Sequence, residues 1–145
     1  MFMAGILIAL LSGALMSVQG VFNTQVTKVS GIWPANVFVQ FTALAVCLGM
    51  WLATGRESLV KVFAVQPKYM LLGGIMGACI TYTVIKSMAL LGPAKAVLLI
   101  VICQLAVAYV IELFGVFGAE KQPWQWQKAI CMALAVTGIF LFQRK

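Results

Sequence analysis

The sequence has 145 residues, of which 63% are hydrophobic and 9% are charged, and its net charge at pH 7 is +7. In soluble domains about a quarter of all residues are charged. This composition therefore argues against a water-soluble globular protein and predicts an all-α integral membrane protein. The ten lysines and arginines are scattered between apolar stretches, as is usual for membrane-protein loops. Phosphate binding needs clustered cations, so we expect no nucleic-acid partner.

Five apolar segments predict a bundle of five transmembrane helices that uses nearly the whole chain, as one domain over residues 1–145. A helix needs about 20 apolar residues to cross the hydrocarbon core. The first segment lacks the basic N-terminal region of a cleaved signal peptide, and it is longer than the apolar region of such a peptide. We therefore expect the segment to be retained in the mature protein. The predicted helices cover approximately residues 3–26, 32–54, 69–90, 94–114 and 126–142.

Residues at the ends of these segments place them relative to the membrane surface. Trp33 and Trp51 lie eighteen residues apart on the second segment, about 27 Å along a helix, which suits one indole in each headgroup layer. The polar linker that follows has an apolar middle, residues 59–65, that we expect to lie on the membrane surface. Gly92 and Pro93 end the third helix, because proline cannot extend it. The fifth helix is the shortest, so we expect Lys128 to snorkel.

Small residues recur at four-residue spacing on three of the predicted helices. In lipid, helices associate through close packing and interhelical hydrogen bonds, so such ridges predict helix contacts, within one bundle or across a dimer. A direct role in solute binding is the alternative. The ridges consist of Ala9, Gly13 and Ser17; Gly73, Gly77 and Thr81; and Ala129, Ala133 and Thr137.

Polar side chains within the apolar segments are the candidates for a binding site. Unpartnered carboxamides are costly at membrane depth, so they should face the bundle interior. Two interpretations stay open: they bond helix to helix, or they line a polar cavity that binds a solute. The set comprises Ser12, Gln19 and Asn23 on one face of the first helix, Asn36 and Gln40 on the second, Tyr82 and Lys86 on the third, and Gln104 on the fourth. Those we predict to bind solute are Gln19, Asn23, Gln40, Tyr82 and Gln104.

Two ionisable residues near helix ends allow more than one role. Glu112 is the carboxylate that falls within a predicted helix. It either snorkels to the interface or couples transport to protons or another cation. Lys86 either lies at the interface or pairs with Glu112 or an anionic ligand.

The sequence lacks the residues of an enzyme site. It contains no histidine, and we find no nucleophile elbow, phosphate loop or paired carboxylates. We therefore expect no enzymatic activity, no cofactor and no ATP-driven transport by this chain alone. The four cysteines lie far apart in apolar runs, so a disulfide framework or zinc site is not expected.

Several short motifs, in order along nearly the whole chain, resemble the YdcZ family of the drug/metabolite transporter superfamily. They are Gln19 to Asn23 with Gly20 and Phe22 between; Ser30, Gly31 and Ala35; Gly73, Gly74 and Gly77; Leu91 to Ala94; and Gln104 followed by Glu112 and Gly115. The resemblance implies an exporter of small molecules in the bacterial inner membrane, with about five helices per chain and a working unit of two chains. The second chain would be another copy or a paired homologue.

The resemblance also places the chain near the four-helix small multidrug resistance proteins, which carry a coupling glutamate in their first helix. This chain has Gln19 and Asn23 there instead, so proton antiport by that route is not expected. The function we predict is secondary transport of a small solute by alternating access as a dimer. The alternative is a non-transporting membrane subunit that stabilises or regulates a partner.

The distribution of lysine and arginine predicts how the chain inserts. Five helices place Arg56, Lys61, Lys68, Lys121 and Lys128 on one side, and Lys28, Lys86, Lys95, Arg144 and Lys145 on the other. Orientation follows an excess of these residues on the cytoplasmic side, and here the sides balance. We therefore predict dual topology and an antiparallel homodimer, which reproduces the inverted repeat of many transporters. The alternative is a single orientation, fixed by a partner chain or by one dominant helix.

Overall fold

The computed structural model describes residues 2–143, and these contain helices and no strand. The predicted all-α class is therefore confirmed. Arg144 and Lys145, on which the predicted charge balance partly depends, lie outside the described residues. The long helices are α1 (Phe2–Ser30), α2 (Ile32–Ala53), α3 (Gly73–Leu91), α4 (Pro93–Phe114) and α5 (Trp126–Gln143), and the 3₁₀ helices are η1 (Leu59–Ala64), η2 (Lys68–Leu72) and η3 (Val116–Gly118).

Within residues 2–143, four helical segments are long and apolar enough to cross a membrane. They are Met3–Ser30, Ile32–Ala53, Lys68–Leu91 and Pro93–Phe114. The apolar part of α5, Trp126–Ile139, is shorter. The chain is thus an all-α membrane protein, while a fifth span stays a prediction.

The chain divides into two compact units, residues 1–90 with α1 to α3 and residues 91–145 with α4 and α5. The expectation of one domain over residues 1–145 stays a prediction.

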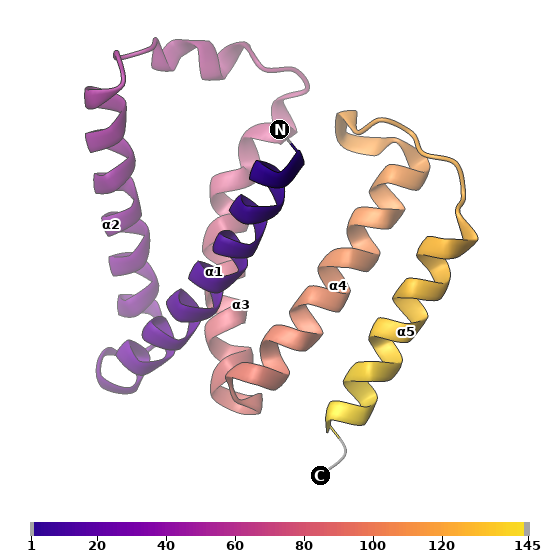
Figure 1. The fold of residues 1–145 in the computed structure, drawn as a ribbon. Coiled ribbons are helices and arrows are strands. Elements are labelled where there is room, and N and C mark those ends of the chain that lie inside the picture. Colours follow the sequence, from indigo (N-terminus) through magenta and orange to yellow (C-terminus); the bar gives the residue numbers. More distant parts are fainter. Residues whose placement is uncertain (1, 144–145) are drawn as a thin grey trace. The chain divides into compact units, whose positions relative to one another are not determined.

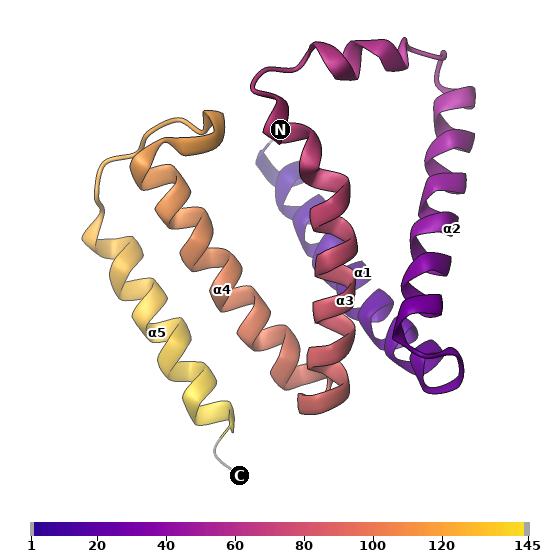
Figure 2. The same cartoon turned by 180° about the vertical axis from the view of Figure 1, so that it is seen from behind.

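In the first unit, α1 and α2 meet at a tight turn and diverge away from it (Figures 1 and 2). Gly31 forms this turn with φ of +82°, a value that favours glycine because it has no Cβ. Helix α1 runs four residues further than the predicted end at residue 26. The Thr27 and Ser30 hydroxyls donate to helix carbonyls at 2.8 and 3.0 Å, so the helix continues past Lys28, the first charged residue, to the glycine.

The linker between α2 and α3 is partly helical, and the start of α3 differs from the predicted one. Helix η1 spans the apolar middle of the linker, and Leu59, Val60 and Phe63 are exposed there. The segment from residue 68 forms 3₁₀ turns before α3 begins at Gly73. The position of η1 on the membrane surface stays a prediction.

The break between α3 and α4 lies where proline chemistry places it. Helix α3 ends at Leu91, Gly92 has φ of +81°, and Pro93 begins α4. Proline suits the first position of a helix, where its missing N–H has no intrahelical acceptor.

Candidate functional site: a groove between two helices

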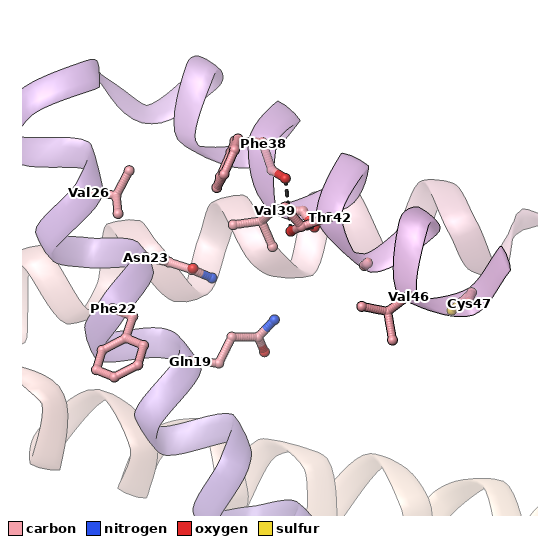
Figure 3. A pocket seen from close by; sticks show the side chains of 10 residues that line it. Gln19, Phe22, Asn23, Val26, Phe38, Val39, Thr42, Val46 and Cys47 are labelled. Atoms are coloured by element: carbon pink, nitrogen blue, oxygen red, sulfur yellow. Dashed lines mark hydrogen bonds between the residues drawn. The ribbon is translucent and has the colours of Figure 1, made fainter. Parts of the chain in front are cut away.

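A groove with a volume of about 550 Å³ lies between the second half of α1 and α2. Its walls are formed by residues at three- and four-residue spacing, so one face of each helix lines it. The groove is open rather than enclosed. The lining residues are Gln19, Phe22, Asn23, Val26, Phe38, Val39, Thr42, Ala43, Val46 and Cys47 (Figure 3).

The α1 wall carries two carboxamides, those of Gln19 and Asn23, one helical turn apart. Figure 3 shows both amides extending toward the α2 wall. Asn23 is buried and Gln19 is exposed. Within residues 2–143, neither side chain has a hydrogen-bond partner, so each keeps N–H donors and a carbonyl acceptor for a bound molecule. The structure thus brings two of the predicted solute-binding residues into one groove.

The α2 wall is mainly apolar, with one hydroxyl and one thiol. The Thr42 hydroxyl donates within its own helix, toward the carbonyls of Phe38 and Val39 at 3.0 Å each. Its oxygen lone pairs therefore remain as acceptors. Cys47 lies one turn beyond Ala43 and is an exposed free thiol. We did not predict this wall, because a mostly apolar face gives no polar signal in the sequence.

Behind the groove, the Met88 side chain of α3 reaches α1 at Gly20. A Cβ at this position would lie 2.4 Å from Met88 Cε and 2.7 Å from Met88 Sδ, so a side chain there would force Met88 to move. The Thr24 hydroxyl donates to the Gly20 carbonyl at 2.8 Å. Sequence reasoning missed this contact, although Gly20 and Thr24 have the same four-residue spacing of small residues that singled out Gly13 and Ser17.

The two amides predicted on α2 have different positions. Asn36 is only 3% exposed, and its Nδ2 donates to the Ala78 carbonyl of α3 at 3.1 Å. Its Oδ1 has no partner in the described chain, and such a group lowers stability. Gln40 is half-buried and does not line the groove. Asn36 thus joins α2 to α3, as the helix-bonding interpretation expects, while solute contact by Gln40 stays a prediction.

Tyr82 belongs to an aromatic contact rather than to the groove lining. Its ring stacks on Trp33 of α2 with centroids 5.1 Å apart. Lys86 donates to the Tyr82 hydroxyl at 3.1 Å, and its Nζ lies 5.4 Å from the centre of the ring. Tyr82 thus links Lys86 to the tryptophan that we expect in the headgroup layer. Solute binding by Tyr82 stays a prediction.

In the second unit, α4 and α5 are joined by an ion pair with aromatic neighbours, here called the ion-pair cluster: Tyr109, Glu112, Trp124 and Lys128. Lys128 Nζ lies 3.1 Å from Glu112 Oε2, and both side chains are partly exposed. The same Nζ lies 5.7 Å from the centre of the buried Tyr109 ring. The Tyr109 hydroxyl accepts a bond from the Gln125 N–H at 3.3 Å, and Trp124 packs on Tyr109 with ring centroids 5.8 Å apart.

Glu112 therefore has a cationic partner in its own unit. The carbonyl of Glu112 also accepts a bond from the Gln122 N–H at 2.9 Å, which holds the α4–α5 loop against the end of α4. Gln104 is exposed on α4 and is absent from the lining of two cavities, each of about 270 Å³, that described residues of α4 and α5 form. The prediction that Gln104 shares a cavity with Gln19 and Asn23 stays a prediction.

The small-residue ridges make no close contact at the glycines we singled out. A Cβ at Gly13, Gly73 or Gly77 would meet no atom within 4 Å in the described chain. The Ser17 hydroxyl donates to the Gly13 carbonyl of its own helix at 3.0 Å. Packing by these residues, within one bundle or across a dimer, thus stays a prediction.

One family model matches residues 4–141, which is nearly the whole chain and includes every residue of the groove. The description of that family is "putative inner membrane exporter, YdcZ". No curated protein and no solved structure matches the chain.

Proposed function

Because the chain belongs to the YdcZ family of inner membrane exporters, we propose that it exports a small solute by alternating access, as a dimer. The groove between α1 and α2 is the solute-binding part of this proposal. The observation that carries it is the pair of unbonded amides of Gln19 and Asn23 in a cavity between apolar helices. Amides that served only to join helices would be bonded to protein, as Asn36 Nδ2 is.

The open groove supports a dimer. Small-molecule sites bury about 70–90% of the ligand surface. This groove is open, because only α1 and α2 line it, and it would leave part of a ligand uncovered. Leu7, Leu10 and Phe41 are among many exposed apolar side chains on α1 and α2, so lipid, the second unit of the chain or a second chain covers these faces. A second copy closes the groove and supplies the other half of an alternating-access transporter.

Solute flux from proteoliposomes tests this function. Vesicles that contain the pure protein are loaded with a panel of labelled neutral, cationic and anionic solutes. We expect at least one solute to leave faster than from protein-free vesicles. Gln19→Leu and Asn23→Leu should each slow that flux about tenfold or more, since each removes hydrogen bonds to the solute. Gln25→Leu, an exposed site on α1 outside the groove, is the matched control.

Normal flux in both groove variants would place the solute site elsewhere. Absence of flux for every solute would favour the non-transporting subunit.

The balanced charges support an antiparallel arrangement in which copies insert both ways. A single cysteine at the C-terminus of a cysteine-free chain reports orientation through labelling with a membrane-impermeant maleimide. We expect labelling from both sides of the membrane, about equally, because neither side has the excess of lysine and arginine that sets orientation. Labelling from one side only would contradict dual topology and leave the export proposal intact.

A further inference from the structure

The groove contains no charged side chain. Its ten lining residues include no carboxylate, ammonium or guanidinium group. An ion that enters an apolar cavity loses its hydration, and this cost is offset only when an opposite charge or several hydrogen bonds replace the water. The walls that α1 and α2 supply therefore disfavour both cationic and anionic solutes.

The polar atoms that the groove does offer are neutral donors and acceptors. The amides of Gln19 and Asn23 each present N–H donors and a carbonyl acceptor. Four residues along a helix correspond to about 6 Å, so one small functional group with both donor and acceptor atoms can reach both amides. Thr42 presents an acceptor oxygen on the opposite wall.

The remaining seven lining residues are apolar and suit an apolar body. Phe22, Phe38 and Val46 are among them, and the volume of about 550 Å³ lies within the range of roughly 300–1,000 Å³ that is usual for small-molecule sites. We propose that the groove selects an electrically neutral, amphipathic small molecule whose polar end is a carboxamide or a hydroxyl group. This inference rests on the proposed export function, because it names the class of solute that the same groove takes.

Cys47 provides a reporter on the wall of this groove. In the full chain with the other three cysteines changed to serine, alkylation of Cys47 by N-ethylmaleimide measures access to the groove. A chain that keeps Cys79 alone, an exposed thiol on α3, is the control. The probes share one phenylpropyl skeleton and differ in charge: 3-phenylpropanamide is neutral, 3-phenylpropylamine is cationic and 3-phenylpropanoate is anionic.

We expect 3-phenylpropanamide to slow alkylation of Cys47 but not of Cys79. The two charged probes should need about tenfold higher concentrations for the same protection, because they bring an unpaired charge into an apolar groove. Protection by either charged probe at equal or lower concentration would overturn the inference. So would equal protection by all three probes, which would indicate a site for any apolar chain, or protection by none.

Changing the charge of the groove sharpens the test. Gln19→Glu introduces a carboxylate of nearly the same size, so the cationic amine should become the best protector of Cys47 and the anion the worst. Gln25→Glu makes the same change on an exposed part of α1 outside the groove and should leave the preference for the neutral amide. If Gln19→Glu leaves the order of the probes unchanged, Gln19 does not contact the ligand and the inference is wrong.

The outcomes separate this inference from the proposed function. Flux of a charged solute that also protects Cys47 would keep export and overturn neutral selectivity. Selective protection by the amide without flux of any solute would keep the selectivity of the groove and overturn export.

Discussion

The groove and the ion-pair cluster use polar residues in opposite ways. In the groove, the Gln19 and Asn23 amides are neutral, have no protein partner in the described chain and face a cavity. In the cluster, Glu112 and Lys128 are charged and bonded to each other at 3.1 Å. A free hydrogen-bonding group can exchange water for a solute, whereas a paired group must first lose its partner. The neutral amides, rather than the paired Glu112 carboxylate, are therefore the better candidates for solute binding.

The largest effect on stability is expected at Gly20, where the Met88 side chain of α3 contacts α1. Gly20→Val should lower the free energy of unfolding by about 1 kcal/mol, the low end of the range for overpacking, because the flexible end of the Met88 side chain must move aside to make room. Thermal unfolding of the purified protein in detergent measures this. Gly5→Val, on the same helix with no neighbour within 4 Å and outside the predicted packing ridges, is the control and should not lower the midpoint. Equal losses in both variants would show that α1 does not pack on α3 at Gly20.

A smaller effect is expected in the ion-pair cluster. Glu112→Gln removes a pair whose side chains are 46% and 39% exposed, and ion pairs of this kind contribute about 0–1 kcal/mol. We expect the unfolding midpoint to fall slightly, if at all, and the pH profile of solute flux to keep its shape. Lys128→Gln should have the same small effect on stability, because it breaks the same pair. Loss of pH dependence in Glu112→Gln would identify Glu112 as the coupling carboxylate and reverse the comparison between the two regions.

Most of the helix pattern was predictable because it depends on local chemistry. Long apolar runs mark the helices, and Gly92 with Pro93 ends one and begins the next. The end of α1 was not predictable from charge alone, because Lys28 lies within its last turn. Threonine and serine hydroxyls bond to the helix there, and only the positive φ of Gly31 ends it.

The site was predictable in part. The four-residue spacing of Gln19 and Asn23 placed them on one face, and that face lines the groove. The same spacing did not show that Asn36 would turn to α3 while Gln40 would not reach the groove. The contacts of each side chain depend on how the neighbouring helices pack against its own helix. The sequence of one helix does not contain the directions in which its neighbours pack.

Solute is expected to bind the amides of the groove and not the charges of the ion-pair cluster. Flux of one transported solute, measured side by side in proteoliposomes with Asn23→Leu and Glu112→Gln at equal protein content, tests it most directly. We predict a loss of about tenfold or more for Asn23→Leu, since a lost hydrogen bond to a desolvated solute has this effect. Glu112→Gln should retain flux close to that of the unmodified protein. Normal flux in Asn23→Leu together with lost flux in Glu112→Gln would contradict the account.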